Sequence, residues 1–307
     1  MNAAIRPPDK AEAFSPCASW PASLSLGFAK RQRGVRLVRA EHEGPLYVQK
    51  AFYPEGEHCA HCYLLHPPGG LVTGDQLNIT IQAETGSHAL ITTPGAGRVY
   101  KAREQSGVQT QSIHLQVEAQ ACLEWMPLET ILFPHARARL NTRIDLAEQA
   151  KVIAWDITCF GLPANGIEFT EGSVQQHLQV WSAGRIVLNE RLVIDLSADQ
   201  ASPTSTTLTG NAGFRAKPVH GLLIAGPLEK DEADIAALIE KLREIEVKQI
   251  NLQANDLVSV TQVGAFLGVR YLGWCTESAR SYFTEVWCCL RPHLMAREAV
   301  SPRIWAT

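Results

Sequence analysis

The sequence predicts a mainly β protein that carries two helices. Short segments of alternating apolar and polar residues recur roughly every ten residues between Trp20 and Leu196, and turn-forming residues separate them. Such spacing is typical of an all-β sandwich, a barrel or a stack of sheets, and the pattern leaves these three open. Two longer segments in the C-terminal half have apolar residues at helical spacing instead.

Period-two alternation and short apolar runs place the strands in chain order. The turn Ser182-Ala183-Gly184 lies between two of them. The expected strands cover residues 34–39, 77–83, 88–93, 113–117, 174–180, 185–196, 219–225 and 258–272.

The two expected helices cover residues 230–247 and 277–297. In both, apolar residues recur at i, i+3, i+4 and i+7, and charged residues fill the opposite face of the first. Thr276 or Ser278 is the expected N-cap of the second helix. Pro292 is expected to interrupt or end that helix, because proline lacks a backbone N–H.

The domain organisation follows from these elements. Residues 1–19 are rich in Pro and Ala without periodicity, so they are expected to be a flexible N-terminal tail. Strands resume after the polar segment 197–210, which therefore reads as a loop. Residues 20–307 are expected to form a single β-rich domain with that loop within it.

Composition and charge exclude several classes of protein. Of 307 residues, 46% are apolar and 19% are charged, which is globular composition. The net charge is −3 and the basic residues are scattered, so no nucleic-acid partner is expected. No apolar run approaches the ~18 residues of a membrane span, and the N-terminus has no secretory apolar region. We expect a cytoplasmic protein without a membrane partner, whose eight cysteines are reduced.

Two turn-rich motifs dominate the first half of the chain, His66–Asp75 (HPPGGLVTGD) and Thr92–Ala96 (TTPGA). Proline fixes φ and glycine allows a positive φ, so both segments specify unusual backbone paths. Asp75 ends the first motif. Its carboxylate is either held in a pocket where it meets a cation, or it caps its own turn.

A cluster of soft metal ligands precedes the first motif. Thiolate and imidazole suit zinc and nickel, and Cys-x-x-Cys is half of a structural zinc site, but no second pair follows. If residues 60–66 form a strand, His61 points away from Cys62 and His66. The alternatives are an ordinary loop that runs into a strand, a structural zinc-binding module, or a metal-dependent hydrolase that also uses Asp75. The cluster comprises His58, Cys59, His61, Cys62 and His66.

Several carboxylates end or interrupt apolar segments. Such an acid has a local partner or faces a polar cavity, because burying a lone charge is costly. Taken singly, each is more often an ordinary surface residue. Together they could line a hydrophilic channel for a divalent cation; the candidates include Glu129, Asp156, Glu168 and Glu190.

The motifs of the common nucleotide-binding and hydrolytic enzymes are missing from the sequence. It contains no G-x-x-x-x-G-K-[ST], no H-E-x-x-H and no G-x-S-x-G. The chain is therefore not expected to be an enzyme of these classes.

Ordered segments over nearly the whole chain resemble the family of urease accessory protein D (UreD). No single segment is decisive, but their order and spacing are specific. One departure is Leu162, where the family usually has arginine; another is Ile167, which separates Gly166 from Glu168. The matching segments are GPLYVQK (44–50), FYPEG (52–56), HPPGGLVTGD (66–75), TTPGA (92–96) with Tyr100, EWMPLETILF (124–133), WD (155–156), FG (160–161), GIEF (166–169), VW (286–287), LRP (290–292) and PRIW (302–305).

The resemblance implies a body of β-solenoid or β-helix type with two packed helices. It implies a non-enzymatic scaffold that binds urease apoprotein and accessory protein F, through which it reaches the GTPase accessory protein G, as a dimer within the complex. It also implies that no cofactor is permanently bound and that Ni²⁺ passes through an internal tunnel in transit. By position, Asp75, Asp156 and Glu190 are the best candidates to line that tunnel. Weaker candidates for metal contact are Glu129, Glu168, His66 and Cys62.

Overall fold

The structure is a computed structural model that describes residues 21–103, 107–196, 207–229, 231–248 and 255–306. The tail predicted for residues 1–19 and most of the loop predicted for 197–210 lie outside these residues. In the part of the chain that is described, no helix has the length and hydropathy needed to cross a membrane.

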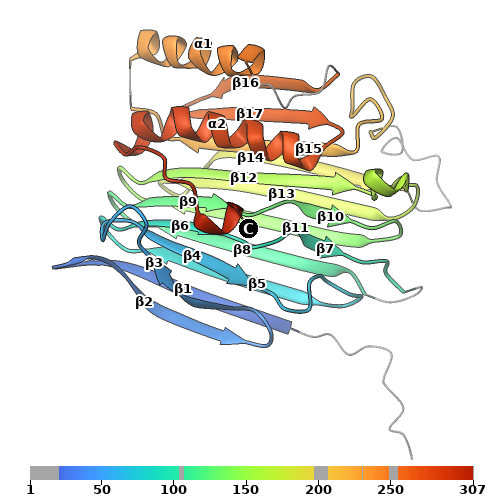
Figure 1. Ribbon diagram of the computed structural model, residues 1–307, viewed down its shortest axis with the longest axis horizontal. Helices are drawn as coiled ribbons and strands as arrows, with labels where there is room; N and C mark the ends of the chain where they lie inside the picture. The colour runs from blue at the N-terminus through green and yellow to red at the C-terminus, as the bar shows by residue number, and fades with distance from the viewer. Residues whose placement is uncertain (1–20, 104–106, 197–206, 230, 249–254, 307) are drawn as a thin grey trace, which may run out of the picture.

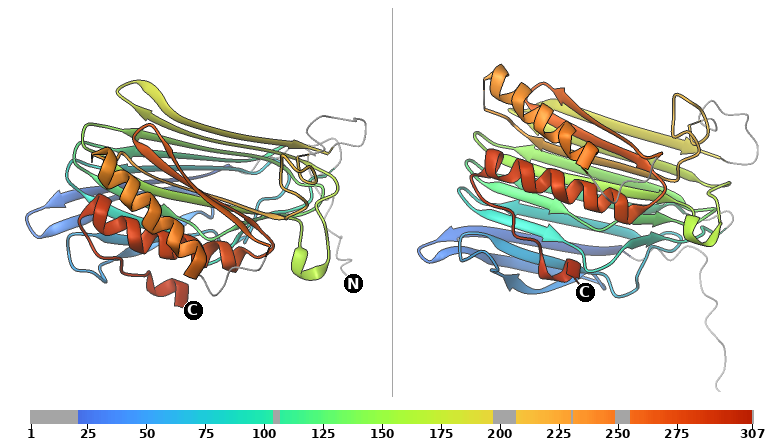
Figure 2. Two further views of the ribbon diagram at one scale, coloured as in Figure 1. Left: turned by 90° about the horizontal axis from the view of Figure 1, so that it is seen from above. Right: turned by 45° about the horizontal axis from the view of Figure 1, so that its top comes forward.

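Two β-sheets face each other and two helices cover one of them (Figures 1 and 2). Sheet A has the strand order β14-β13-β11-β8-β5-β1-β2. Sheet B has the order β16-β17-β15-β12-β9-β6-β4-β3, with β10 beside β12 and β7 beside β10. The strands of sheet A are β1 (Pro21–Arg31), β2 (Gly34–Glu43), β5 (Gln76–Ala83), β8 (Gln109–Val117), β11 (Arg137–Leu146), β13 (Ser173–Ser182) and β14 (Arg185–Asp195). Those of sheet B are β3 (Tyr47–Phe52), β4 (Ala60–Leu65), β6 (His88–Thr92), β7 (Gly97–Val99), β9 (Cys122–Met126), β10 (Thr130–Leu132), β12 (Lys151–Phe160), β15 (Val219–Gly226), β16 (Leu257–Val263) and β17 (Phe266–Gly273).

The chain alternates between the sheets in the middle of the molecule. β5, β8, β11 and β13 follow one another in parallel in sheet A, while β4, β6, β9 and β12 do so in sheet B. The sheets are open at both edges, so the barrel alternative is excluded. The predicted mainly β class of stacked sheets with two helices is confirmed.

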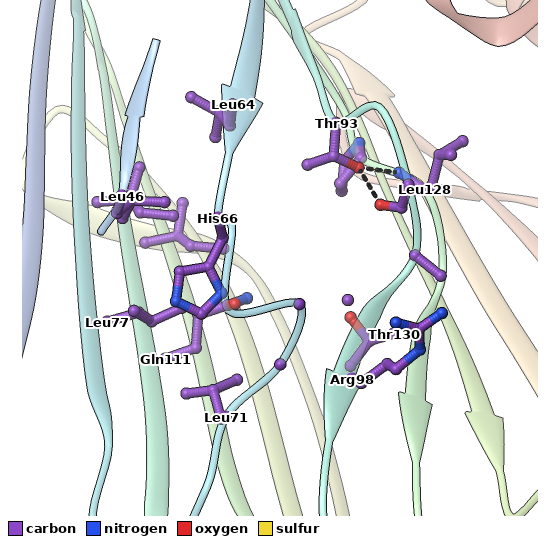
Figure 3. Close-up of a pocket in the computed structure, with 18 of the residues that line it drawn as sticks. Leu46, Leu64, His66, Leu71, Leu77, Thr93, Arg98, Gln111, Leu128 and Thr130 are labelled. Carbon is purple, nitrogen blue, oxygen red and sulfur yellow. Dashed lines mark hydrogen bonds between the residues drawn. The ribbon is translucent and has the colours of Figure 1, made fainter. Parts of the chain in front are cut away.

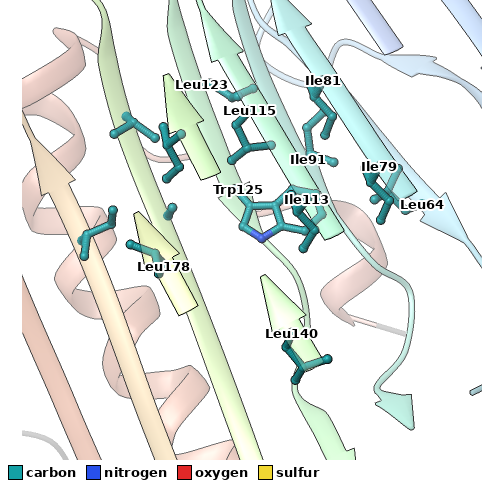
Figure 4. Close-up of a cluster of buried hydrophobic side chains, with 14 of the residues drawn as sticks. Leu64, Ile79, Ile81, Ile91, Ile113, Leu115, Leu123, Trp125, Leu140 and Leu178 are labelled. Carbon is teal, nitrogen blue, oxygen red and sulfur yellow. The ribbon is translucent and has the colours of Figure 1, made fainter. Parts of the chain in front are cut away.

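A first hydrophobic core lies between the two sheets (Figure 4). It consists of the inward-facing residues of each alternating strand, and Trp125 lies near its centre, surrounded by residues such as Ile113 and Leu178. The alternation of apolar and polar residues in the sequence therefore indicates which side of each strand faces the opposite sheet.

A second core lies on the other face of sheet B, beneath α1 (Glu232–Lys248) and α2 (Thr276–Met295). Trp155 of β12 and Trp287 of α2 are almost fully buried there. Because sheet B is covered on both faces, β6 and most of β12 are apolar at successive positions rather than alternating. Trp305, in the short helix η3 (Arg303–Ala306), packs on both tryptophans.

Three sequence predictions differ in detail from the structure. The N-cap of α2 is Cys275, in extended conformation, rather than Thr276 or Ser278. Pro292 neither interrupts nor ends α2, which continues to Met295, so the proline falls in its last turn. The strand expected over 258–272 is a hairpin of β16 and β17, because Gly264 adopts a left-handed conformation and reverses the chain.

Candidate functional site

The two turn motifs meet at a cavity of about 300 Å³. The Leu71 N–H donates to the Arg98 carbonyl at 2.8 Å, and the Tyr100 N–H donates to the Leu71 carbonyl at 3.0 Å. The His66–Asp75 motif therefore lies against β7, which follows the second motif. Figure 3 shows His66 on one wall of this cavity and Arg98 with Thr130 on the opposite wall.

Two glycines of the first motif are required by the backbone here, Gly69 by its conformation and Gly70 by this close approach. Gly69 has φ of +74°, a region that favours glycine. A Cβ on Gly70 would lie 2.6 Å from the Tyr100 ring and 2.8 Å from the Arg98 carbonyl. The glycines of this motif are therefore explained by the packing of one cavity wall.

Asp75 caps the turn that it ends. Its Oδ2 accepts a hydrogen bond from the Val72 N–H at 2.8 Å, and its own N–H donates to the Val72 carbonyl at 3.0 Å. Asp75 therefore caps its own turn, as one of the two sequence predictions had it. Its negative charge also affects the pKa of His66. Burial lowers the pKa of His66, and the Asp75 charge opposes that shift. Asp75 thus lies near the cavity residue His66.

Asp156 lines two different cavities. It lies in the middle of β12 on the face turned toward sheet A, since its neighbours Trp155 and Ile157 belong to the helix-side core. It lines the first cavity and also a second one of about 140 Å³. Burial raises the pKa of the Asp156 carboxyl to about 6, because a low-dielectric environment disfavours the charged form.

The second cavity is polar although it lies between two sheets. Gln176 of β13 donates to the Thr158 hydroxyl of β12 at 2.7 Å, which links the sheets. Glu190 of β14 accepts a hydrogen bond from the Arg270 guanidinium of β17. All four side chains line this cavity together with Asp156.

Two basic side chains line both the second cavity and a third, of about 360 Å³. His220 of β15 and Arg270 line both. Burial, and to a lesser extent the Arg270 charge, lowers the pKa of His220 to about 4, so its imidazole is neutral at physiological pH. The His220 ring stacks on Phe214 with ring centroids 5.1 Å apart.

The two weaker carboxylate candidates lie elsewhere. The half-buried Glu129 accepts a hydrogen bond from the Gly97 N–H through its backbone carbonyl at 2.8 Å. The exposed Glu168 lines a separate, largely apolar cavity with Ile167 and Trp274. Neither is among the lining residues of the three cavities above.

The Cys/His cluster is dispersed by the alternation of β4. His58 is exposed. Cys62 points into the core between the sheets, where burial raises the pKa of its thiol to about 12. Cys59 and His61 lie on the helix side of sheet B. The structure therefore does not bring Cys59 and Cys62 to one site, and His66 lies apart from both in the first cavity.

A buried ionic cluster beneath α2 is the largest feature that the sequence reasoning missed. Its centre is Arg291 of α2, whose Nη2 lies 2.9 Å from Glu124 Oε1 and 2.7 Å from Glu55 Oε1. His88 Nε2 lies 2.6 Å from Glu124 Oε1, and His61 Nε2 lies 2.7 Å from Glu55 Oε1. Burial alone would raise the pKa of both glutamates, but these partners outweigh it and hold each pKa below its ordinary value.

This cluster ties α2 to sheet B. The Trp287 indole also donates to Glu124, at 2.5 Å. The ligand atoms of Cys59 with His88 and Glu124, or with Glu55 and His61, lie within 4.8 Å of one another, a spacing that a metal ion also requires. The Arg291 guanidinium already supplies the positive charge there, so we assign the cluster a structural role, as a clamp between α2 and sheet B. Glu124 and Arg291 are 167 residues apart in the chain, and both lie in segments that carry the family resemblance.

Comparison with known proteins decides the family. The family model described as UreD urease accessory protein matches residues 21–306. The chain belongs to the UreD family. The urease accessory protein UreD of Marinomonas sp. (strain MWYL1) is 46% identical over 288 residues, which cover 94% of this chain and 90% of that protein. Those of Methylobacillus flagellatus and Nitrosococcus oceani are 40% and 38% identical, over 94% and 100% of this chain and 95% and 96% of their own lengths.

The UreD motifs converge on the features described above. HPPGGLVTGD and TTPGA line the first cavity. EWMPLETILF contributes Trp125 and Thr130 to that cavity and Glu124 to the ionic cluster. The resemblance predicted from ordered segments is thus confirmed, and its segments are brought together in space.

Proposed function

We propose that this chain is a non-catalytic maturation factor of urease. It acts as a scaffold that joins apo-urease to accessory protein F, and through F to the GTPase accessory protein G. It conducts Ni²⁺ toward the urease active site through the space between its two sheets. Its membership of the UreD family and the names of its relatives, which are urease accessory proteins, support this proposal.

The observation that carries the nickel path is the position of Asp156. A buried ionisable carboxylate costs stability unless it is paired or hydrogen-bonded, and burial is the cause of the raised pKa of Asp156. Here it separates two cavities and its pKa is raised to about 6, so at neutral pH it is mostly ionised and attracts a cation. The second cavity is large enough for a few water molecules, which lets an ion keep part of its hydration shell.

The proposed path runs from His66 past Asp156 to Glu190. These side chains come from the His66–Asp75 motif, sheet B and sheet A in turn, so the ion meets isolated oxygen and nitrogen ligands. Imidazole and carboxylate bind divalent nickel, and few ligands at each point favour release over storage. Asp75 supplies negative charge beside His66. Glu129 and Glu168 lie off this path, and Cys59 and Cys62 play no part in it.

The rest of the proposal concerns the assembly. The protein acts in the cytoplasm as a dimer within the complex, and it holds Ni²⁺ as cargo without a resident cofactor. The zinc-module and hydrolase alternatives each need the Cys/His residues at one point, and the dispersal of Cys59, Cys62 and His66 gives neither alternative support.

Urease activation in cells tests the proposed function. Cells express the urease subunits and the other accessory proteins, with or without this chain, and urease protein, bound nickel and activity are measured together. We expect urease to accumulate without nickel and without activity when the chain is missing. Normal nickel content in its absence would overturn the proposal.

A further inference from the structure

The carboxylate of Glu190 in the second cavity is already occupied by a cation of the protein itself. The Arg270 guanidinium donates to Glu190 through Nη2, and its Nη1 donates to the Thr261 hydroxyl at 3.2 Å. Glu190 belongs to β14, the edge strand of sheet A, and Arg270 belongs to β17 of sheet B. The pair therefore bridges the two sheets where they are open.

This ion pair differs from the clamp beneath α2. The Arg291 side chain is fully buried and contacts two glutamates. Arg270 and Glu190 are 34% and 33% exposed, and no second salt bridge of either is found among the described residues. A partly hydrated pair with one contact exchanges partners readily, because water can replace each half of it.

The Arg270 guanidinium lies beside a glycine and keeps a second contact besides Glu190. A Cβ added to Gly268 would lie 3.4 Å from Arg270 Nη1, so the guanidinium lies over a residue without a side chain. Its second anchor, Thr261, lies on the outermost strand of sheet B, β16. The Thr261 contact at the edge of sheet B does not involve Glu190.

A divalent cation bound to Glu190 would lie close to the Arg270 guanidinium, so two positive charges would compete for one carboxylate. The guanidinium keeps its charge at every physiological pH, so it repels an approaching ion until it swings aside. We propose that Arg270 is an internal gate, which holds Glu190 when the cavity is empty and competes with the metal ion for that carboxylate. The pair re-forms behind the ion and helps to expel it, which suits transfer rather than storage. The identity of the ion as Ni²⁺ rests on the proposed function.

Nickel binding to the full-length chain tests the gate directly. The affinity for Ni²⁺ is measured by isothermal titration calorimetry for the wild type, Arg270→Gln, Arg270→Lys and the double variant Arg270→Gln/Glu190→Gln. Arg143→Gln is the matched control, because it removes one positive charge from the outer face of sheet A, where Arg143 pairs with Asp145.

We expect Arg270→Gln to bind Ni²⁺ about tenfold more tightly than the wild type, a change of about one decade in Kd. Arg270→Lys and Arg143→Gln should stay near the wild type, and the double variant should lose the gain. Arg270→Met replaces the glutamine variant if that one fails to fold, with the same expectation.

The gate and the proposed function can fail separately. Unchanged nickel affinity in folded Arg270→Gln or Arg270→Met would overturn the gate, whatever urease activation shows. A gain that persists in the double variant would overturn it as well, because the metal would then bind elsewhere. A tenfold gain that depends on Glu190 would support the gate even if urease matured normally without this chain, an outcome that would refute only the nickel path.

Discussion

Arg291 connects α2 to sheet B, and its replacement by methionine gives the sharpest stability prediction. The arginine side chain and that of Glu124 are fully buried, and Glu55 is 6% exposed. Methionine has a similar length and keeps the apolar contacts of the arginine stem. The substitution therefore removes the charge and its hydrogen bonds. It leaves the buried Glu124 without an arginine partner, and Glu55 keeps only Arg297, whose Nη1 lies 3.5 Å from its Oε2.

The expected cost follows from that geometry. Removing one partner of a buried ion pair costs about 3–5 kcal/mol, because the remaining charge is left unpaired. For a chain of this size about 1 kcal/mol corresponds to roughly 2 °C, so Arg291→Met should lower Tm by roughly 6–10 °C. The protonation of Glu55 or Glu124 would relieve part of this cost, which puts the expected value toward the lower end.

The assay is thermal unfolding by circular dichroism together with urea unfolding at pH 7. Arg243→Met is the matched control, because Arg243 pairs with Glu240 on the exposed face of α1, where their side chains are 54% and 68% exposed. This control should change the unfolding free energy by less than about 0.5 kcal/mol. A loss below about 1 kcal/mol for Arg291→Met would refute the clamp.

Three further predictions follow from particular side chains. Because the pKa values of Glu55 and Glu124 are lowered in the folded state, the stability that these carboxylates contribute is present at neutral pH. The urea midpoint should begin to fall below about pH 4.5 and should fall further as the pH approaches the folded-state pKa. A midpoint that stays level down to pH 3 would contradict this. Gly70→Ala should lower the free energy of unfolding in urea by about 1–3 kcal/mol, because the added Cβ would clash with Tyr100 and Arg98. Gly95→Ala should be neutral, because no atom lies within 4 Å of its added Cβ. Equal losses in the two variants would contradict the packing of Gly70. Asp156→Asn should stabilise the protein by about 1–3 kcal/mol at pH 7, because the raised pKa means that the ionised carboxylate is costly in the folded state. This gain should shrink as the pH falls through about 6, where the carboxyl becomes protonated. A destabilised variant would contradict the cost of the ionised carboxylate.

Much of the fold could be predicted from local patterns. Period-two alternation located strands such as 77–83, observed as β5, and helical spacing located α1 and α2 within a few residues. The pattern weakens in β12, because both faces of that strand are buried and polar residues no longer mark an outer side. The hairpin at Gly264 was missed because apolar residues continue on both sides of the turn.

Residues of the candidate site could be predicted only where a charged residue interrupts an apolar segment. Asp156 was identified because a carboxylate stands beside Trp155 in an apolar strand. His220 and Arg270 look like ordinary strand residues, and they meet Asp156 only through the antiparallel pairing of β12, β15 and β17. Arg291 was missed because its partners are distant in the chain. Conversely, the Cys-x-x-Cys spacing suggested a shared site that strand alternation separates.

A substitution at Asp156 separates nickel transfer from assembly of the complex. Asp156→Asn keeps the shape of the side chain and removes its charge, and Asp145→Asn is the control on the outer face of sheet A. Both variants are expressed with urease and the other accessory proteins, and the nickel content of purified urease is measured beside the amount of each variant that co-purifies with it.

We expect Asp156→Asn to bind its partners as the wild type does while urease receives at least tenfold less nickel, and Asp145→Asn to leave both unchanged. Full nickel content with Asp156→Asn would contradict the proposed path between the sheets.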